Sequence, residues 1–159
     1  MIDFKINMID GNVKLDNKYL SIQKEDAFIF SEVYKYLKSK NEIQRLTPYH
    51  YTINTALWSG KKFEIIIRPL CFSNLPFMVQ IICKEGEYYN SINDWNKVSD
   101  IDMLNKEVDF LYHWVLDECE PGVPSVKEKH NITWLFAWGD ITICYDIKSF
   151  NCGIYLTWN

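Results

Sequence analysis

The sequence predicts an α+β fold, with one antiparallel β-sheet of about eight strands and two α-helices packed on one face. Apolar and polar residues alternate along several segments, most clearly from Ile141 to Lys148, as expected for strands with one buried face. Turn-forming pairs such as Gly139-Asp140 separate these segments, so neighbouring strands are expected to run antiparallel. Apolar residues recur at helical spacing in two stretches, which begin at Glu25 and Ser99. The predicted order of elements is therefore ββαβββαβββ.

The first half of the chain is predicted to form a hairpin, a helix and three strands. The residues Asp10-Gly11-Asn12 form the turn of the hairpin. The helix has acidic residues at its start and Lys38 and Lys40 at its end, where the helix dipole favours them. The expected bounds are 3–8 and 13–22 for the hairpin, 25–40 for the helix, and 49–57, 62–68 and 77–84 for the strands, with Tyr49, Tyr51, Ile53, Thr55 and Leu57 on one face.

The second half is predicted to hold a polar irregular segment, a long helix and three final strands. Ser99 is a suitable N-cap for this helix, and Pro121-Gly122 ends it. The Gly139-Asp140 turn is expected to join two of the final strands, and Trp134 and Trp138 are expected to be buried in them. The irregular segment covers 85–98, the helix presents an apolar stripe of Ile101, Leu104, Val108, Leu111 and Val115, and the strands cover 132–138, 141–146 and 153–158.

Length and composition indicate a single domain over residues 1–159. Hydrophobic residues make up 48% of the chain, which is enough for a core without a metal or a disulfide. The five cysteines are odd in number and show no C-x-x-C spacing, so reduced thiols are expected. The first residues lack the regions of a signal peptide, and no apolar run reaches the length of a membrane span. We therefore expect a cytoplasmic protein.

Charge and motifs argue against several function classes. A net charge of −4 argues against direct nucleic-acid binding, which requires a basic stripe, and favours a basic protein partner. The chain has no zinc-protease, nucleophile-elbow, P-loop or dinucleotide motif, so no catalytic residue, metal or cofactor is predicted. Asp140 and Asp146 could serve a hydrolase as acid and base, but along one strand they would lie about 20 Å apart. Turn and strand-end roles fit them better.

Acidic residues gather on both sides of the predicted long helix. Its last turn carries Asp117, Glu118 and Glu120, where the helix dipole disfavours negative charge. Further carboxylates and two tyrosines lie in the segment before this helix. Such a broken local rule often marks a functional site, although a solvated acidic face is the simpler interpretation. The candidate partner-binding residues are Glu85, Glu87, Tyr88, Tyr89, Asp94, Asp117, Glu118 and Glu120.

Three segments carry a resemblance to a known family. They are W-x-x-V-S at 95–99, F-A-W-G-D-I-T-I-C-Y-D at 136–146 and I-Y-L-T-W at 154–158. With the layout of the chain, they resemble the bacterial immunity proteins found beside polymorphic toxins, including those of contact-dependent growth inhibition. The resemblance implies a cytosolic protein that binds and occludes a cognate toxin domain, expected to be a basic nuclease, without catalytic residues of its own. A small hydrolase using carboxylates in a cleft and a scaffold subunit are the alternatives.

Overall fold

The computed structural model describes residues 1–20, 25–69 and 76–159, and within these ranges eleven strands form one sheet. The α+β class is confirmed, but the sheet is larger than the eight strands predicted, and it is mixed. All of its described pairs are antiparallel except that of β1 with β5, which is parallel. The strands are β1 (Ile2–Ile6), β2 (Val13–Leu15), β3 (Lys18–Tyr19), β4 (Gln44–Thr47), β5 (His50–Trp58), β6 (Lys61–Arg68), β7 (Met78–Cys83), β8 (Val126–Glu128), β9 (Asn131–Phe136), β10 (Gly139–Tyr145) and β11 (Cys152–Trp158).

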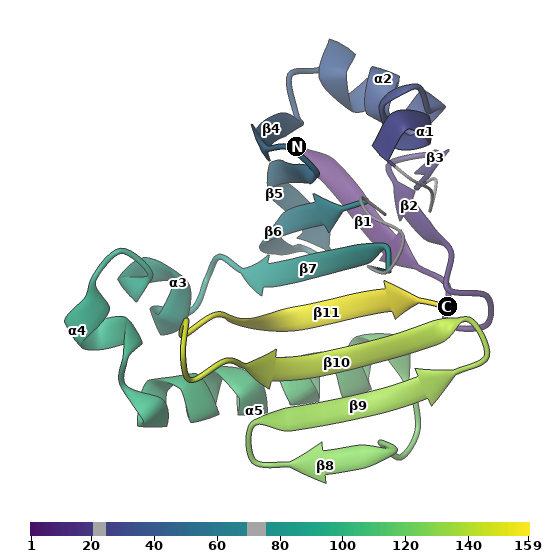
Figure 1. Cartoon of the computed structure of the whole chain (residues 1–159). Coiled ribbons are helices and arrows are strands. Elements are labelled where there is room, and N and C mark those ends of the chain that lie inside the picture. The colour runs from purple at the N-terminus through teal and green to yellow at the C-terminus, as the bar shows by residue number, and fades with distance from the viewer. Residues whose placement is uncertain (21–24, 70–75) are drawn as a thin grey trace.

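Across the sheet the strands follow the order β3-β2-β1-β5-β6-β7-β11-β10-β9-β8 (Figure 1). β4 pairs with the first part of β5, and β1 pairs with its last part. The parallel pair arises because two further strands and two helices separate β1 from β4 and β5, so the chain returns by a long crossover rather than a tight turn. The predicted hairpin at the N-terminus is thus a three-stranded unit; residues 21 and 22, at the end of its predicted second strand, lie outside the described residues.

Helices cover the apolar face of the sheet in two groups, α1 (Glu25–Ile29) with α2 (Glu32–Ser39), and α3 (Glu87–Ser91) with α4 (Trp95–Val98) and α5 (Ile101–Cys119). Figure 1 shows α5 behind β9 and β10, and α3 and α4 beyond the end of β7 and the start of β11. The ring of Phe28 on α1 contacts Tyr51, and the ring of Trp114 on α5 contacts Trp58. Both partners lie on the buried face of β5, so the prediction that the helices share one face is confirmed.

The core beneath these helices is a continuous apolar layer. Ile53, Ile65, Ile81 and Ile154 are register partners across β5, β6, β7 and β11, and each is at most 1% exposed. Burying such a side chain contributes about 1.5–3 kcal/mol relative to leaving it in water. The alternation is clean in β6, where Phe63, Ile65 and Ile67 are buried, and it sets which face the helices must cover.

Strand β5 departs from the predicted alternation. A bulge between Ile53 and Ala56 inserts a residue that has no partner on β6. An extra residue reverses the inward and outward positions that follow it, so Ala56 and Trp58 are buried in place of the predicted Thr55 and Leu57. Tyr49 precedes the strand, in a turn with φ of 68°.

The hairpin between β9 and β10 also turns two residues earlier than predicted. Gly139 already pairs with Phe136, so the two turn residues are Ala137 and Trp138. Trp134 is 2% exposed, and its burial is confirmed. The prediction that Trp138 is buried within a strand is wrong, because it stacks on Phe136 in the turn and is only half-buried.

Helix boundaries follow capping residues more closely than apolar spacing. The predicted helix over 25–40 is two helices, because the extended backbone of Ser31 ends α1 and its hydroxyl caps α2 by accepting from the Tyr34 N–H. The segment 85–98, predicted as irregular, contains α3 and α4. Asp100, rather than Ser99, is the N-cap of α5. The apolar stripe of α5 is buried as predicted, except for Ile101.

In the described part of the chain, no helix combines the length and the apolar character needed to cross a membrane. Cys83, Cys119, Cys144 and Cys152 are free thiols. Cys71, the fifth cysteine, lies outside the described residues.

Candidate functional site

The segment 85–120, here called the acidic segment, contains α3, α4 and α5. It carries ten acidic residues and two lysines, a formal charge of −8, whereas the other 123 residues carry eleven acidic and fifteen basic residues, a formal charge of +4. Nine of the ten carboxylates are exposed, and the tenth, Glu107, is buried. The acidic segment is therefore strongly negative, even though the net charge of the whole chain is small.

The eight predicted binding residues do not form one cluster. Glu85 precedes α3 and Glu87 begins it, whereas Glu118 and Glu120 lie at the far end of α5. The 19 residues of α5 span about 28 Å at 1.5 Å per residue, so one contact point cannot include both ends. Asp102, Asp109 and Asp117 are exposed at intervals of about two turns and connect the two groups along the outer face of α5.

Several of the predicted carboxylates already hold structural partners. Glu85 accepts from the Lys62 N–H at 3.0 Å and pairs with the Lys61 ammonium at 3.4 Å. The hydrogen bond from Lys62 lowers the pKa of Glu85, and Lys61 adds to this effect. Asp94 is the N-cap of α4, and Glu118 accepts from the Ser59 hydroxyl. Glu120 ends α5 with a left-handed backbone at φ of 46°.

The two predicted tyrosines hold α3 on the sheet. Tyr88 is 1% exposed, and its hydroxyl donates to the Phe150 carbonyl and accepts from the Cys152 N–H, each at 2.9 Å. Burial raises the pKa of Tyr88 to about 12. Tyr89 is half-buried and donates to a Glu64 carboxylate oxygen at 3.0 Å. Tyr88 therefore presents no surface to a partner.

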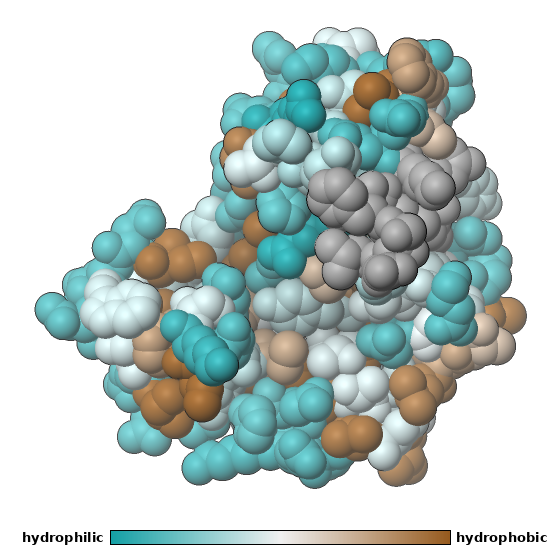
Figure 2. Space-filling view, viewed as in Figure 1, coloured by the Kyte–Doolittle hydropathy of each residue, from teal (hydrophilic) through white to brown (hydrophobic). Residues whose placement is uncertain are grey.

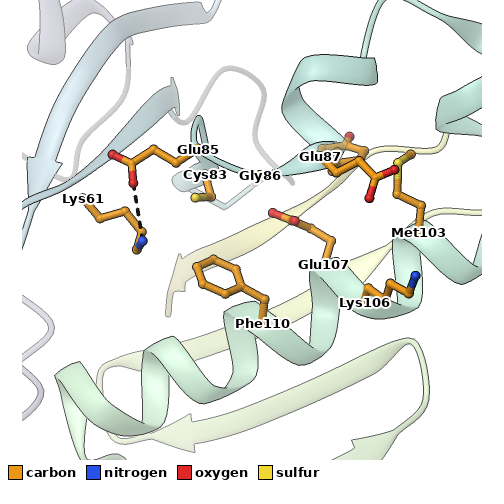
Figure 3. Close-up of a pocket in the computed structure, with 10 residues that line it drawn as sticks. Lys61, Cys83, Glu85, Gly86, Glu87, Met103, Lys106, Glu107 and Phe110 are labelled. Carbon is orange, nitrogen blue, oxygen red and sulfur yellow. Dashed lines mark hydrogen bonds and ion pairs between the residues drawn. The ribbon is translucent and has the colours of Figure 1, made fainter.

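A cavity of about 250 Å³ opens between α3, α5 and the end of β7 (Figure 3). Glu107 points from α5 toward Gly86 and Cys83, while its neighbour Lys106 points away from it. The Phe110 ring faces the Lys61 side of the cavity. The lining residues are Lys61, Cys83, Glu85, Gly86, Glu87, Tyr88, Met103, Lys106, Glu107 and Phe110.

Glu107 is a candidate functional residue that sequence reasoning missed. It is 7% exposed, and its buried Oε1 has no hydrogen-bond partner among the described residues. Burial raises its pKa from 4.5 to about 7. A Cβ on Gly86 would lie 2.9 Å from Glu107 Oε2, so glycine at this position leaves room for the carboxyl group. The sequence did contain a signal for its burial, because Glu107 lies three residues after Leu104 and four before Leu111, on the apolar stripe of α5.

Exposed apolar side chains lie among the carboxylates of the acidic segment. Trp95 on α4 is 62% exposed, and Phe110 at the cavity is 37% exposed. Ile92 and Ile101 are also partly exposed. Figure 2 shows hydrophobic residues next to hydrophilic ones over the α3 and α4 projection. Aromatic residues within a polar rim are typical of protein-binding surfaces.

The carboxylates considered for hydrolysis do not converge. Asp140 lies on β10, not in a turn as predicted, and accepts from the Thr142 hydroxyl. Asp146 follows the other end of β10 and accepts from the Lys148 N–H. Residues 1–20, 25–69 and 76–159 contain no group of three or more His, Cys, Asp or Glu residues that could hold a metal ion.

Comparison with known proteins finds no matching family model, no matching curated protein and no matching solved structure.

Proposed function

We propose that this protein is an immunity protein that binds a basic toxin domain, a nuclease, and blocks it by covering its active or substrate-binding face. The observation that carries the proposal is the charge separation, with −8 on the acidic segment and +4 on the rest of the chain. Because the exposed carboxylates line α5 and its flanks, they form a surface rather than a point.

This surface suits a nuclease because nucleases hold the phosphate backbone with lysine and arginine side chains. Carboxylates presented on a helix compete for the same cations and accelerate the encounter through long-range attraction. Trp95 and Phe110 supply apolar contacts that can lose water on binding, which lengthens the lifetime of a complex.

The resemblance of the segments 95–99, 136–146 and 154–158 to immunity proteins adds the class of partner. It implies a protein in the cytosol of the cell that makes the toxin, where the inhibitor would meet the toxin domain. Of these segments, 95–99 belongs to the acidic surface and covers α4.

The test is a pair of matched charge reversals. Asp109→Lys with Asp117→Lys changes the outer face of α5, and Asp26→Lys with Glu32→Lys makes the same change of net charge on exposed residues of α1 and α2. Association with the toxin domain encoded next to this protein's gene is measured by stopped flow at low and high salt. We expect the α5 variant to associate about 10-fold more slowly at low salt, with a flatter salt dependence.

The control variant should associate at nearly the wild-type rate, and thermal melts should show that both variants fold. Equal slowing in both variants would mean that net charge alone acts, and the acidic segment would not be the interface. If no toxin domain binds the wild-type protein, the immunity function is wrong.

A small hydrolase is the second candidate, and one observation favours it. Glu107 is a buried carboxyl group with a raised pKa in a cavity, which is the profile of a general acid, and Glu87 lines the same cavity. This function predicts turnover of ester or glycoside substrates by the wild type and at least about 100-fold less by Glu107→Gln. Absence of wild-type turnover would exclude it.

A further inference from the structure

We propose that the cavity beside Glu107 is a socket for one arginine side chain of the bound partner, whose guanidinium group pairs with the Glu107 carboxylate. The inference rests on the proposed function for the identity of the partner. The chemistry of the socket can be tested on this protein alone.

The first argument is the unmet hydrogen-bonding capacity of Glu107. A buried carboxylate is stable only when donors or cations surround it, yet Oε1 has no donor in the described ranges. A guanidinium group supplies two parallel N–H donors and a positive charge, so it would both hydrogen-bond the carboxylate and neutralise it. A neutral ligand would leave the charge without a counterion.

The second argument is the size and the wall of the cavity. A volume of about 250 Å³ is below that of sites for drug-sized molecules and suits a single long side chain. Phe110 and Met103 form apolar walls against which a planar guanidinium and its methylene stem can pack. Partial exposure of Phe110 keeps the cavity accessible from outside.

The third argument is the balance of the other titratable groups around the cavity. Lys61 lies 3.4 Å from Glu85 and 5.4 Å from the centroid of the Phe110 ring, so its charge is compensated within the wall. Lys106 points away from Glu107. Burial raises the pKa values of the Cys83 thiol and the Tyr88 hydroxyl, which keeps both neutral.

Glu87, in the first turn of α3, is the remaining charged group of the lining. Its side chain forms no hydrogen bond or ion pair with another described residue, so it can add a second negative charge at the entrance. The charge available to an incoming ligand is therefore negative, and an anion would be repelled.

The ionised form of Glu107 is the form that binds a cation. Because burial raises its pKa to about 7, acidification should weaken binding. Between pH 8.5 and pH 5.5 the ionised fraction of a group with this pKa falls about 30-fold, and the affinity for a cation should fall with it. An exposed carboxylate would show no such change in this range.

The experiment titrates methylguanidinium into the full-length protein, with carboxyl carbon shifts of labelled glutamate followed by NMR. At pH 8.5 we expect saturable binding in the millimolar range, as suits a fragment of five heavy atoms. Glu107→Gln should bind at least 10-fold more weakly. Asp26→Asn removes one exposed charge from α1, outside the acidic segment, and should bind like the wild type.

Methylammonium provides the arm that separates arginine from lysine. We expect it to bind at least 5-fold more weakly than methylguanidinium, and equal binding would overturn the arginine assignment. Binding that survives Glu107→Gln, or no saturable binding, would overturn the socket. Neither result would decide the proposed immunity function, which the charge-reversal test addresses, because no partner is present in this experiment.

Once a partner is in hand, Glu107→Gln should weaken the complex about 10–100-fold at pH 8.5. Substitution of one partner arginine by lysine should cause a similar loss, which largely disappears in the Glu107→Gln background. Independent losses from the two changes would contradict a direct pair.

Discussion

Each of the two helical groups on the apolar face carries a carboxylate, Glu25 in one and Glu107 in the other. The two carboxylates differ in their hydrogen-bond partners. Glu25 on α1 accepts hydrogen bonds from the Tyr51 hydroxyl at 2.5 Å and the Tyr49 N–H at 3.4 Å, and it pairs with Arg45 at 3.5 Å. Glu107 on α5 leaves Oε1 without any described partner. The carboxylate of Glu25 is thus satisfied within the fold, whereas that of Glu107 keeps an acceptor free for the proposed ligand.

The carboxylates around the two helical groups also differ in whether they have partners. Asp16, beside α2, is held by the Tyr36 hydroxyl and by Lys40. Burial acts to raise the pKa of Asp16, but the hydrogen bonds from Tyr36 and the Asp3 N–H, with Lys40, outweigh it and lower the pKa. The α1–α2 side is therefore electrostatically satisfied. The α3–α5 side exposes nine carboxylates and encloses a tenth.

The largest difference should come from the aromatic residues of the two groups. Phe28 on α1 is fully buried and contacts the rings of Tyr34 and Tyr51 at 5.4 and 5.1 Å. Phe28→Ala should lower the free energy of unfolding by about 3–5 kcal/mol. Phe110→Ala should cost less than about 1 kcal/mol, because that ring is 37% exposed. Urea unfolding measures both, and similar losses would break the comparison.

The next effect is a pH dependence with a defined sign. Burial raises the pKa of Glu107 from 4.5 to about 7, so between these values the folded state binds more protons than the unfolded state. Stability should therefore fall as the pH rises through this window, by at most about 3 kcal/mol in total. Glu107→Gln should lack this fall and be the more stable protein at pH 8.

The measurement is urea unfolding of wild type and Glu107→Gln at pH 4, 6 and 8. The difference between the two proteins isolates Glu107 from the other titrating groups. A difference that stays constant with pH would show that Glu107 is solvated or has found a donor.

The smallest effect should come from the satisfied carboxylate. Glu25→Gln removes the charge that Arg45 and the Tyr51 hydroxyl recognise and should cost about 1–2 kcal/mol at pH 7. Its exposed neighbour provides the control, since Asp26→Asn should change stability by less than about 0.5 kcal/mol. A gain in stability from Glu25→Gln would remove the contrast with Glu107.

The sequence alone determined the elements in which the local pattern and the burial agree. Ile141, Ile143 and Tyr145 alternate, and all three are buried on β10 as predicted. The spacing of Leu104, Val108, Leu111 and Val115 predicted the inner face of α5. These predictions succeed because a strand or helix that buries one face has a period that depends only on its own backbone. The acidity of the segments before and after α5 could also be predicted, because it depends only on which residues they contain.

Tertiary structure decided the features that depend on a second element. The bulge in β5 depends on its pairing with β6, which holds up to Ile53 and resumes at Ala56. No pattern within β5 alone indicates the bulge. The predicted acidic cluster is divided because α5 is long and straight enough to hold its ends apart. Glu107 is a candidate binding residue only in the folded protein, where α3 and β7 pack around it and supply no donor to Oε1. Isolation of a charge is a property of everything that surrounds it, so it arises only when the chain has folded.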